Sequence, residues 1–129
     1  EFMNYKRIIP AENPTKVVLN RSDFLESVER ASLLAKVGKN NLIKLDIKDG
    51  NIEITSKSEE GNVKEEVIAT KEGNDLVIGF NSKYMIDALK VIDDESITMF
   101  FNTSVSPCLV KPVTGDSFEY LILPVRISQ

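Results

Sequence analysis

Histidine is absent from this sequence of 129 residues, and cysteine occurs only once, as Cys108. Without histidine the chain carries no Ser-His-Asp or Cys-His nucleophile, no zinc ion held by imidazole and no histidine pH switch. A single cysteine forms no disulfide within the chain, so we expect an intracellular, cytoplasmic protein. No cation neighbours Cys108 in the sequence, and we interpret it as a small core residue rather than a reactive thiol.

Long apolar runs and glycine-rich loops are missing as well. No apolar run approaches the roughly 20 residues that a membrane-spanning helix requires, so we expect no membrane partner. The six glycines stand singly, and none belongs to a phosphate-binding loop. Lys and Arg number 16 against 20 Asp and Glu, and the resulting net charge of −4 disfavours tight non-specific binding to DNA. The sequence predicts no cofactor and no metal site.

The remaining composition is that of one globular domain, with 42% hydrophobic and 28% charged residues. A chain of this length buries enough surface to hold a core unaided. Glu1 and Phe2 precede Met3, and we interpret residues 1–3 as a cloning remnant. Residues 4–129 are then the domain, which we expect to be part of something larger.

Hydrophobic spacing predicts two helices among short strands. Apolar positions recur with helical period after Ser22, which is the expected N-cap of the first helix, and again after Asn81 and Ser82. Asp49-Gly50 predicts a hairpin turn, because the segments on either side alternate apolar and polar residues. Extended segments are expected at residues 8–9, 16–20, 42–47, 52–55, 63–70, 76–80, 96–101, 108–112 and 118–125.

The expected elements follow the order β-α-β-β-β twice. A shift of 60 positions overlays Val17 on Val77 and Ser22 on Ser82. We therefore predict an α+β fold of two pseudo-symmetric halves, in which two helices pack on antiparallel sheet.

The acidic pairs are poor candidates for catalysis. Glu65 and Glu66 lie next to each other on an expected strand, so their side chains point to opposite faces and cannot work as a paired acid and base. Asp93 and Asp94 fall in a turn. We interpret these carboxylates as surface residues.

Five basic residues fall on the polar faces of the expected helices, interrupted by acidic residues. They are Arg21, Arg30, Lys36, Lys83 and Lys90. The mixture of signs is typical of an ordinary solvated face and favours only weak contact with phosphates.

The carboxy-terminal residues 120–127 form a nearly unbroken apolar segment. A buried last strand explains Tyr120 to Leu123, but Pro124 cannot continue a central strand. We therefore expect Pro124 to Ile127 to lie outside the sheet. An apolar segment left partly exposed in this way is typical of a docking surface.

Four segments in order resemble the third, C-terminal domain of the bacterial DNA polymerase III beta subunit, the sliding clamp. They are Tyr-x-Arg-apolar-apolar-Pro at residues 5–10, Ile-Gly-Phe-Asn-Ser-Lys-Tyr at 78–84, Thr-Ser-Val-Ser-Pro at 103–107 and the apolar segment at 120–127. The resemblance covers essentially the whole chain after the first three residues. It implies the DNA-clamp fold, in which doubled β-α-β-β-β domains form a ring of two subunits with helices toward the DNA.

The function that the resemblance implies is non-catalytic. The ring encircles double-stranded DNA and acts as a processivity factor, so net negative charge on one domain is no contradiction. This domain would dock short peptides that begin with Gln and end in apolar or aromatic residues. Such peptides would belong to the polymerase III alpha subunit, the clamp loader, and other polymerases or repair proteins. The full-length protein is expected to be a homodimer, and the isolated domain a monomer.

The resemblance also assigns residues to three surfaces. The peptide-binding pocket would be lined by Arg7, Ile8, Asn81, Tyr84, Val105, Pro107, Leu121, Leu123, Pro124, Val125 and Arg126. The subunit interface would use Leu33, Leu34, Val63, Lys64, Glu65, Glu66 and Val67. The five basic helix residues named above would face the DNA channel.

Two positions depart from the family pattern. Met3 stands where the family usually has Pro, and Pro107 where Ser is common. Two alternatives remain at this point: a small enzyme that uses carboxylates on an α+β sheet, and a ligand-binding domain of unrelated descent.

Overall fold

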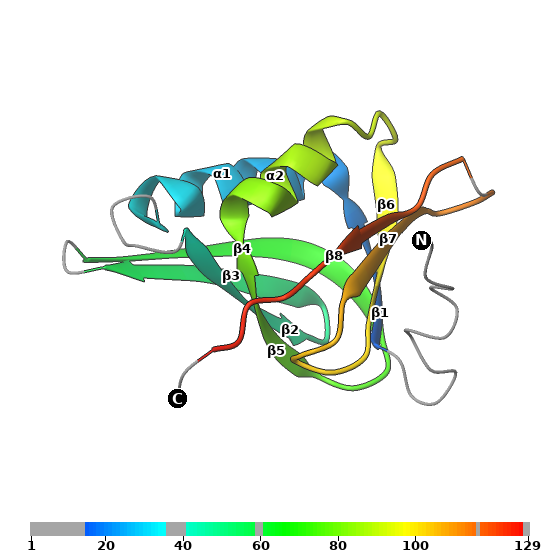
Figure 1. Cartoon of the computed structure of the whole chain (residues 1–129). Coiled ribbons are helices and arrows are strands. Elements are labelled where there is room, and N and C mark those ends of the chain that lie inside the picture. The colour runs from blue at the N-terminus through cyan, green and yellow to red at the C-terminus, as the bar shows by residue number, and fades with distance from the viewer. Residues whose placement is uncertain (1–14, 36–40, 59–60, 116, 128–129) are drawn as a thin grey trace, which may run out of the picture.

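The computed structural model describes residues 15–35, 41–58, 61–115 and 117–127, and these ranges contain two helices and eight strands (Figure 1). The elements in chain order are β1 (Thr15–Asn20), α1 (Arg21–Ala35), β2 (Leu42–Lys48), β3 (Asn51–Ser58), β4 (Gly61–Glu72), β5 (Leu76–Asn81), α2 (Ser82–Lys90), β6 (Ser96–Phe101), β7 (Cys108–Pro112) and β8 (Tyr120–Ile122). The order β-α-β-β-β therefore occurs twice, as predicted. The segment expected at residues 8–9 lies outside the described residues.

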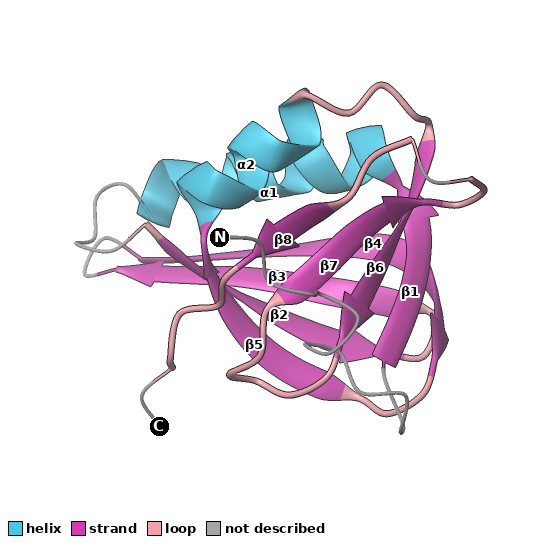
Figure 2. Cartoon of the chain, turned by 45° about the vertical axis from the view of Figure 1, so that its right-hand side comes forward, coloured by secondary structure: helices cyan, strands magenta, loops and turns pink. Residues whose placement is uncertain are grey.

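All eight strands belong to one curled antiparallel sheet in the order β5-β2-β3-β4-β1-β6-β7-β8. Both helices pack side by side on the same face of this sheet (Figure 2). The hydrophobic core fills the space between helices and sheet, and it includes Phe24 of α1, Met85 of α2 and Phe101 of β6. The predicted α+β fold is confirmed.

The hairpin of β2 and β3 shows how the sequence builds this sheet. Ile43, Leu45 and Ile47 are buried against the core, whereas the residues between them are partly exposed. The turn between the strands contains Gly50 at φ +86°, which is a left-handed conformation that glycine adopts without steric cost. The turn expected from Asp49-Gly50 is confirmed.

An asparagine directly precedes each helix. The Oδ1 atom of Asn20 accepts a hydrogen bond of 2.9 Å from the backbone N of Asp23, and Oδ1 of Asn81 accepts one of 2.9 Å from the N of Lys83. Both are N-caps that satisfy an amide left without a partner in the first turn. The expected cap at Ser22 is therefore wrong, because the cap is Asn20, two residues earlier, and α1 begins at Arg21.

The two halves repeat with an offset of 61 residues. The caps Asn20 and Asn81 are 61 positions apart, and the same offset places Val17 on Ile78, which are both fully buried. The expected shift of 60 is wrong because it overlays buried Val17 on Val77, which is 39% exposed. A slip of one residue in a strand exchanges the two faces of the sheet.

The last strand is shorter than expected, and the segment after it returns to the sheet. β8 ends at Ile122, two residues before Pro124, in agreement with the inability of proline to continue a ladder. The backbone N of Val125 then donates a 2.8 Å hydrogen bond to the carbonyl O of Gly79 in β5, and the two residues form an isolated antiparallel bridge. The expectation that the whole segment lies outside the sheet is wrong, because Val125 joins the two edges of the sheet.

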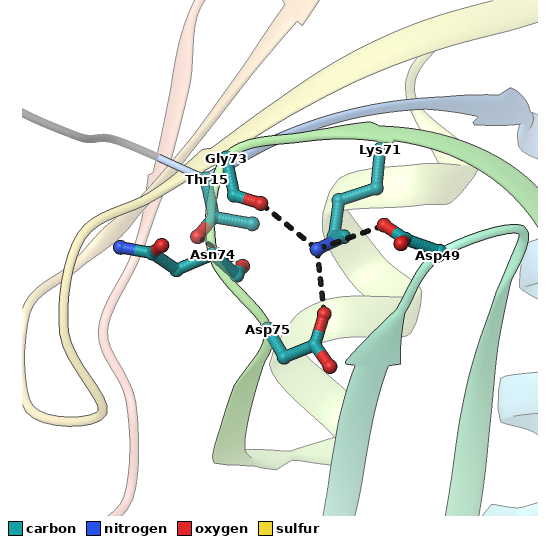
Figure 3. Close-up of polar contacts among 6 residues, drawn as sticks. All are labelled: Thr15, Asp49, Lys71, Gly73, Asn74 and Asp75. Atoms are coloured by element: carbon teal, nitrogen blue, oxygen red, sulfur yellow. Dashed lines mark hydrogen bonds and ion pairs between the residues drawn. The ribbon is translucent and has the colours of Figure 1, made fainter.

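The buried side chain of Lys71 forms ion pairs with residues of two turns at one end of the sheet (Figure 3). The Nζ of Lys71 lies 3.0 Å from Oδ1 of Asp49, in the β2–β3 turn, and donates 2.9 Å to the carbonyl O of Gly73. It also donates to Asp75 in the β4–β5 loop, and this hydrogen bond is the main reason that the pKa of Lys71 is raised. The Lys71 side chain is only 4% exposed, although both carboxylates reach solvent.

Candidate functional site

The carboxy-terminal segment lies between the start of β7 and the end of β5. Cys108 pairs with Ile122, and Val125 bridges to Gly79. The four residues from Ile122 to Val125 therefore connect β8 to β5, the two edge strands of the sheet, as the chain after β8 shows in Figure 1. The loop before β7 and the beginning of α2 flank this connection.

Large apolar side chains are exposed on all three of these elements. Leu123 of the carboxy-terminal segment is 70% exposed, Tyr84 in the first turns of α2 63%, and Val105 of the β6–β7 loop 58%. Leu121 is also exposed, whereas Pro107 is half-buried. Large exposed apolar side chains are typical of a binding site where they form a continuous patch.

Polar groups accompany the apolar ones. Arg126 is exposed, and the Pro124 and Val125 side chains beside it are half-buried. Asn81 is half-buried and uses Oδ1 to cap α2, so its side-chain amide nitrogen remains as a donor for a ligand. The strand register places Ile122 beside β7 and Val125 beside β5, so the predicted docking residues from Leu121 to Arg126 lie on or next to the segment between these strands. Arg7 and Ile8 lie outside the described residues.

The β6–β7 loop is held in shape by its own hydroxyl groups. Thr103 Oγ1 lies 2.7 Å from Ser106 Oγ and accepts a 3.2 Å hydrogen bond from the N of Val105. The N of Ser106 donates 3.3 Å to the carbonyl O of Thr103. These bonds fix the loop that presents Val105, a feature that the sequence analysis did not identify.

β4 has an open edge along its first two thirds. It pairs with β3 from Gly61 to Ile68, but its pairs with β1 run only from Ala69 to Glu72. Among the described strands, nothing pairs with the second edge of residues 61–68. This stretch contains the predicted interface strand.

The predicted interface residues differ in exposure and partners. Leu33 of α1 is 68% exposed, and Leu34 is half-buried. On β4, Val67 is buried, Val63 is half-buried, and Lys64 lies 3.6 Å from Glu53 of β3. Sequence reasoning missed Ile68, which directly follows the predicted interface residues 63–67 and is 86% exposed.

Glu65 and Glu66 point to opposite faces, as predicted. Glu65 pairs with Arg30 of α1, Oε1 to Nη2, at 3.0 Å. Oε2 of Glu66 accepts a 3.1 Å hydrogen bond from Asn51 on the neighbouring strand. The described residues contain no group of three or more Cys, Asp or Glu that suits a metal ion.

The basic helix residues are largely engaged within the protein. Arg21 donates to the carbonyl O of Leu89 and Asp94, Arg30 pairs with Glu65, and Lys90 lies 3.8 Å from Glu29. Lys83 and Lys90 are exposed beside a groove of about 630 Å³ between α1 and α2. Lys36 lies outside the described residues.

Known proteins resemble this chain over nearly its whole length. The profile of the family described as DNA polymerase III beta subunit, C-terminal domain, matches residues 6–126. The chain belongs to this family. The match confirms the resemblance that the four segments named above indicated.

Individual relatives agree with this family domain. The chain is 46% identical to the beta sliding clamp of Staphylococcus epidermidis over 122 residues, which are 93% of this chain and 32% of the relative. The solved DNA polymerase III beta subunit of Thermotoga maritima superposes with a TM-score of 0.89 at 40% identity, over 99% of this chain and 35% of that one. The DNA polymerase sliding clamp of Bacillus subtilis gives a TM-score of 0.89 at 39% identity, over 99% and 34%. The chain therefore spans about a third of the length of these relatives.

Two further features of this beta-subunit domain bear on the sequence analysis. Cys108 is fully buried, and desolvation raises the pKa of its thiol, so the thiolate needed for nucleophilic attack is suppressed. Within the described ranges, neither helix is long and apolar enough to cross a membrane.

Proposed function

We propose that this chain is the peptide-docking domain of a sliding clamp, a non-catalytic processivity factor that tethers partner proteins to DNA. The observation that supports the proposal is the exposure of Tyr84, Val105 and Leu123 on three elements next to the bridge between Val125 and Gly79. Each large apolar side chain left in water costs free energy that a docked peptide would recover.

The partner that fits this surface is a short peptide with both polar and apolar ends. Exposed aliphatic and aromatic side chains suit apolar or aromatic residues at the peptide's end. The free amide donor of Asn81 and the guanidinium of Arg126 suit a polar residue such as the leading Gln. Peptides of this kind would belong to the polymerase III alpha subunit, the clamp loader, and other DNA polymerases or repair proteins.

The whole protein would act as a ring, since the chain corresponds to a third of its relatives. A homodimer of full-length subunits would encircle double-stranded DNA, with α1 and α2 facing the duplex. Because encirclement is topological, the net charge of −4 and the internal pairing of Arg21, Arg30 and Lys90 do not oppose this role. A replication role would place the protein in the cytoplasm.

The subunit contact of that ring would use exposed Leu33, Leu34 and the open edge of β4 over residues 61–68. An unpaired edge offers its backbone groups to a strand of another chain. The remaining surface of the complete ring, and the second wall of the peptide pocket, would come from domains that precede this one.

Binding of a synthetic peptide tests the proposal. A short peptide that begins with Gln and ends in Leu-Phe should bind this chain in isothermal titration calorimetry. A matched peptide with Ala in place of the Gln and the final Phe should bind at least about tenfold more weakly, because both anchors are lost. Equal affinity for the two peptides would refute specific docking.

A further inference from the structure

Gly79 of β5 lies directly under the carboxy-terminal segment. A Cβ atom placed on Gly79 would lie 2.8 Å from Cγ1 and 3.1 Å from Cδ1 of Ile127, and 3.0 Å from the carbonyl O of Val125. Contacts between carbon atoms are favourable only at about 3.5–4.0 Å. The absence of a side chain at Gly79 is therefore what allows the segment to approach β5.

Backbone conformation does not explain this glycine. Four other described glycines adopt positive φ, namely Gly50, Gly61, Gly73 and Gly115, but Gly79 does not belong to them. A residue with a Cβ atom would fit the backbone of Gly79 without strain. Glycine is required at position 79 for a steric reason, because Val125 and Ile127 occupy the space that a side chain would need.

The pseudo-symmetry of the fold gives an independent comparison. With the offset of 61 residues, Gly79 of β5 corresponds to Val18 of β1. Val18 pairs with Thr70 in a ladder of four consecutive residue pairs between β1 and β4, whereas Gly79 forms the single bridge to Val125. In the first half, Val18 therefore has a side chain and lies in a regular ladder with β4. In the second half, the corresponding residue is a glycine, and the carboxy-terminal segment contacts β5 at one residue pair before it continues to Ile127.

We propose that Gly79 is a positioning residue of the docking site, which seats the carboxy-terminal segment so that Leu123 and Arg126 face the peptide. This inference rests on the proposed function and adds the element that sets the shape of the site. Gly79 lies two residues before the cap Asn81, and its carbonyl O holds the N of Val125 at 2.8 Å. A side chain at Gly79 pushes Ile127 and Val125 away from β5, and the docking residues on either side of Val125 move with them.

The experiment uses the whole chain and the variant Gly79→Ala. The same Gln-led, Leu-Phe-ended peptide should bind this variant about tenfold more weakly, because the site loses its preorganised wall. Hydrogen exchange of the Val125 amide, followed by NMR, should become faster in the absence of peptide. The matched control is Val77→Ala, two residues earlier on the same face of β5, which should change neither affinity nor exchange.

A second variant separates positioning from general damage to the fold. Ile127→Ala removes two of the three atoms that a Cβ on Gly79 would meet. The double variant G79A/I127A should recover most of the affinity that G79A loses, and Val125 exchange should slow again. Contacting residues show such coupling, whereas independent defects add their free-energy costs.

The outcomes are distinct. If wild-type chain binds the peptide and G79A binds it equally well, or if the losses of G79A and I127A simply add, the positioning role is refuted. If wild-type chain does not bind the peptide at all, the proposed function fails and the docking role of Gly79 falls with it. In that case, the rate of hydrogen exchange of the Val125 amide in G79A still shows whether Gly79 holds the carboxy-terminal segment against β5.

Discussion

The side chain of Arg21, the first residue of α1, holds the last turn of α2 through the backbone of Leu89. Its Nη1 donates a 3.1 Å hydrogen bond to the Leu89 carbonyl O, while Nε donates 2.8 Å to the carbonyl O of Asp94. The Leu89 carbonyl O also accepts a long 3.4 Å hydrogen bond from the N of Ile92, so Arg21 adds a second donor at the end of the helix. A cation at this end is also favoured by the helix dipole. The guanidinium thus links the first residue of one half to the end of the helix in the other.

We expect Arg21→Ala to destabilise the domain by about 1.5 kcal/mol, the lower end of the range for hydrogen bonds to a charged group, because one of its two bonds is exposed. Urea unfolding followed by circular dichroism measures the change. The matched control is Arg30→Ala on the same helix, whose ion pair with Glu65 is exposed and should contribute little. Equal stability of R21A and wild type would contradict a structural role for Arg21. Its expected role would then be the one that the resemblance implies, as a basic residue that faces the DNA channel.

The hairpin turn and the starts of the two helices show which parts of the fold local sequence signals can predict. Local signals were sufficient for the hairpin at Asp49-Gly50 and for the start of α2, because the turn residue and the cap lie next to the elements they define. They were insufficient for the start of α1, since both Asn20 and Ser22 are good caps. The choice depends on tertiary contacts: Asn20 still pairs with Ser96 of β6, and the N of Arg21 donates to the carbonyl O of Glu95.

The docking site was predicted through the resemblance rather than through local pattern. Composition indicated only that the segment at residues 120–127 is too apolar for a solvated terminus. The bridge between Val125 and Gly79 joins residues 46 positions apart, and no periodicity in either segment encodes it. The hydroxyl hydrogen bonds of the Thr103 loop were not predicted either, because the bond from Thr103 to the backbone two residues on is a weak turn signal.

The Lys71 cluster predicts a pH-dependent contribution to stability. The pKa of Lys71 is raised in the folded state, mainly by its hydrogen bond to Asp75. Its stabilising effect is therefore fully present below the unfolded pKa of about 10.4 and is lost as pH rises through the folded pKa. Unfolding free energies of wild type and Lys71→Met should differ by a constant amount from about pH 7 to 9 and converge at higher pH.

Urea titrations at several pH values make this comparison. The control is Lys57→Met, an exposed lysine on β3 that should not change stability at neutral pH. A difference that persists undiminished after Lys71 has lost its proton would mean that packing of its aliphatic stem, rather than its charge, stabilises the turns.

The loop that presents Val105 should affect peptide affinity through Thr103. Thr103→Val removes the hydroxyl that bonds Ser106 Oγ and the N of Val105 while keeping nearly the same volume. We expect the peptide to bind several-fold more weakly, because the loop must then be ordered on binding. Calorimetry with the Leu-Phe-ended peptide measures this, and Thr114→Val in the β7–β8 loop is the control. Unchanged affinity in T103V would remove the loop from the site.

The isolated chain should be monomeric at micromolar concentration. In the proposed ring, the surface opposite Leu33 and the open edge of β4 belongs to a different domain, so two copies of this chain offer no complementary pair. Sedimentation velocity gives the mass directly. A stable dimer would point instead to self-pairing of the edge at residues 61–68, which Ile68→Lys should disrupt because Ile68 is 86% exposed on that edge.

The most direct test of peptide docking compares two leucines that are almost equally exposed. Leu123 of the carboxy-terminal segment is 70% exposed and Leu33 of α1 is 68% exposed, so Asp at either position should leave the fold intact. Deletion of the last residues is a poorer test, because it also removes the Val125 bridge to β5.

Calorimetry with the Gln-led peptide should show that Leu123→Asp lowers affinity by more than about 30-fold, as expected when an apolar anchor costs about 2 kcal/mol or more. Leu33→Asp should bind like wild type, because it lies on the surface proposed for the subunit contact. A folded L123D variant that binds the peptide at full strength would contradict the account, and so would an equal loss in both variants.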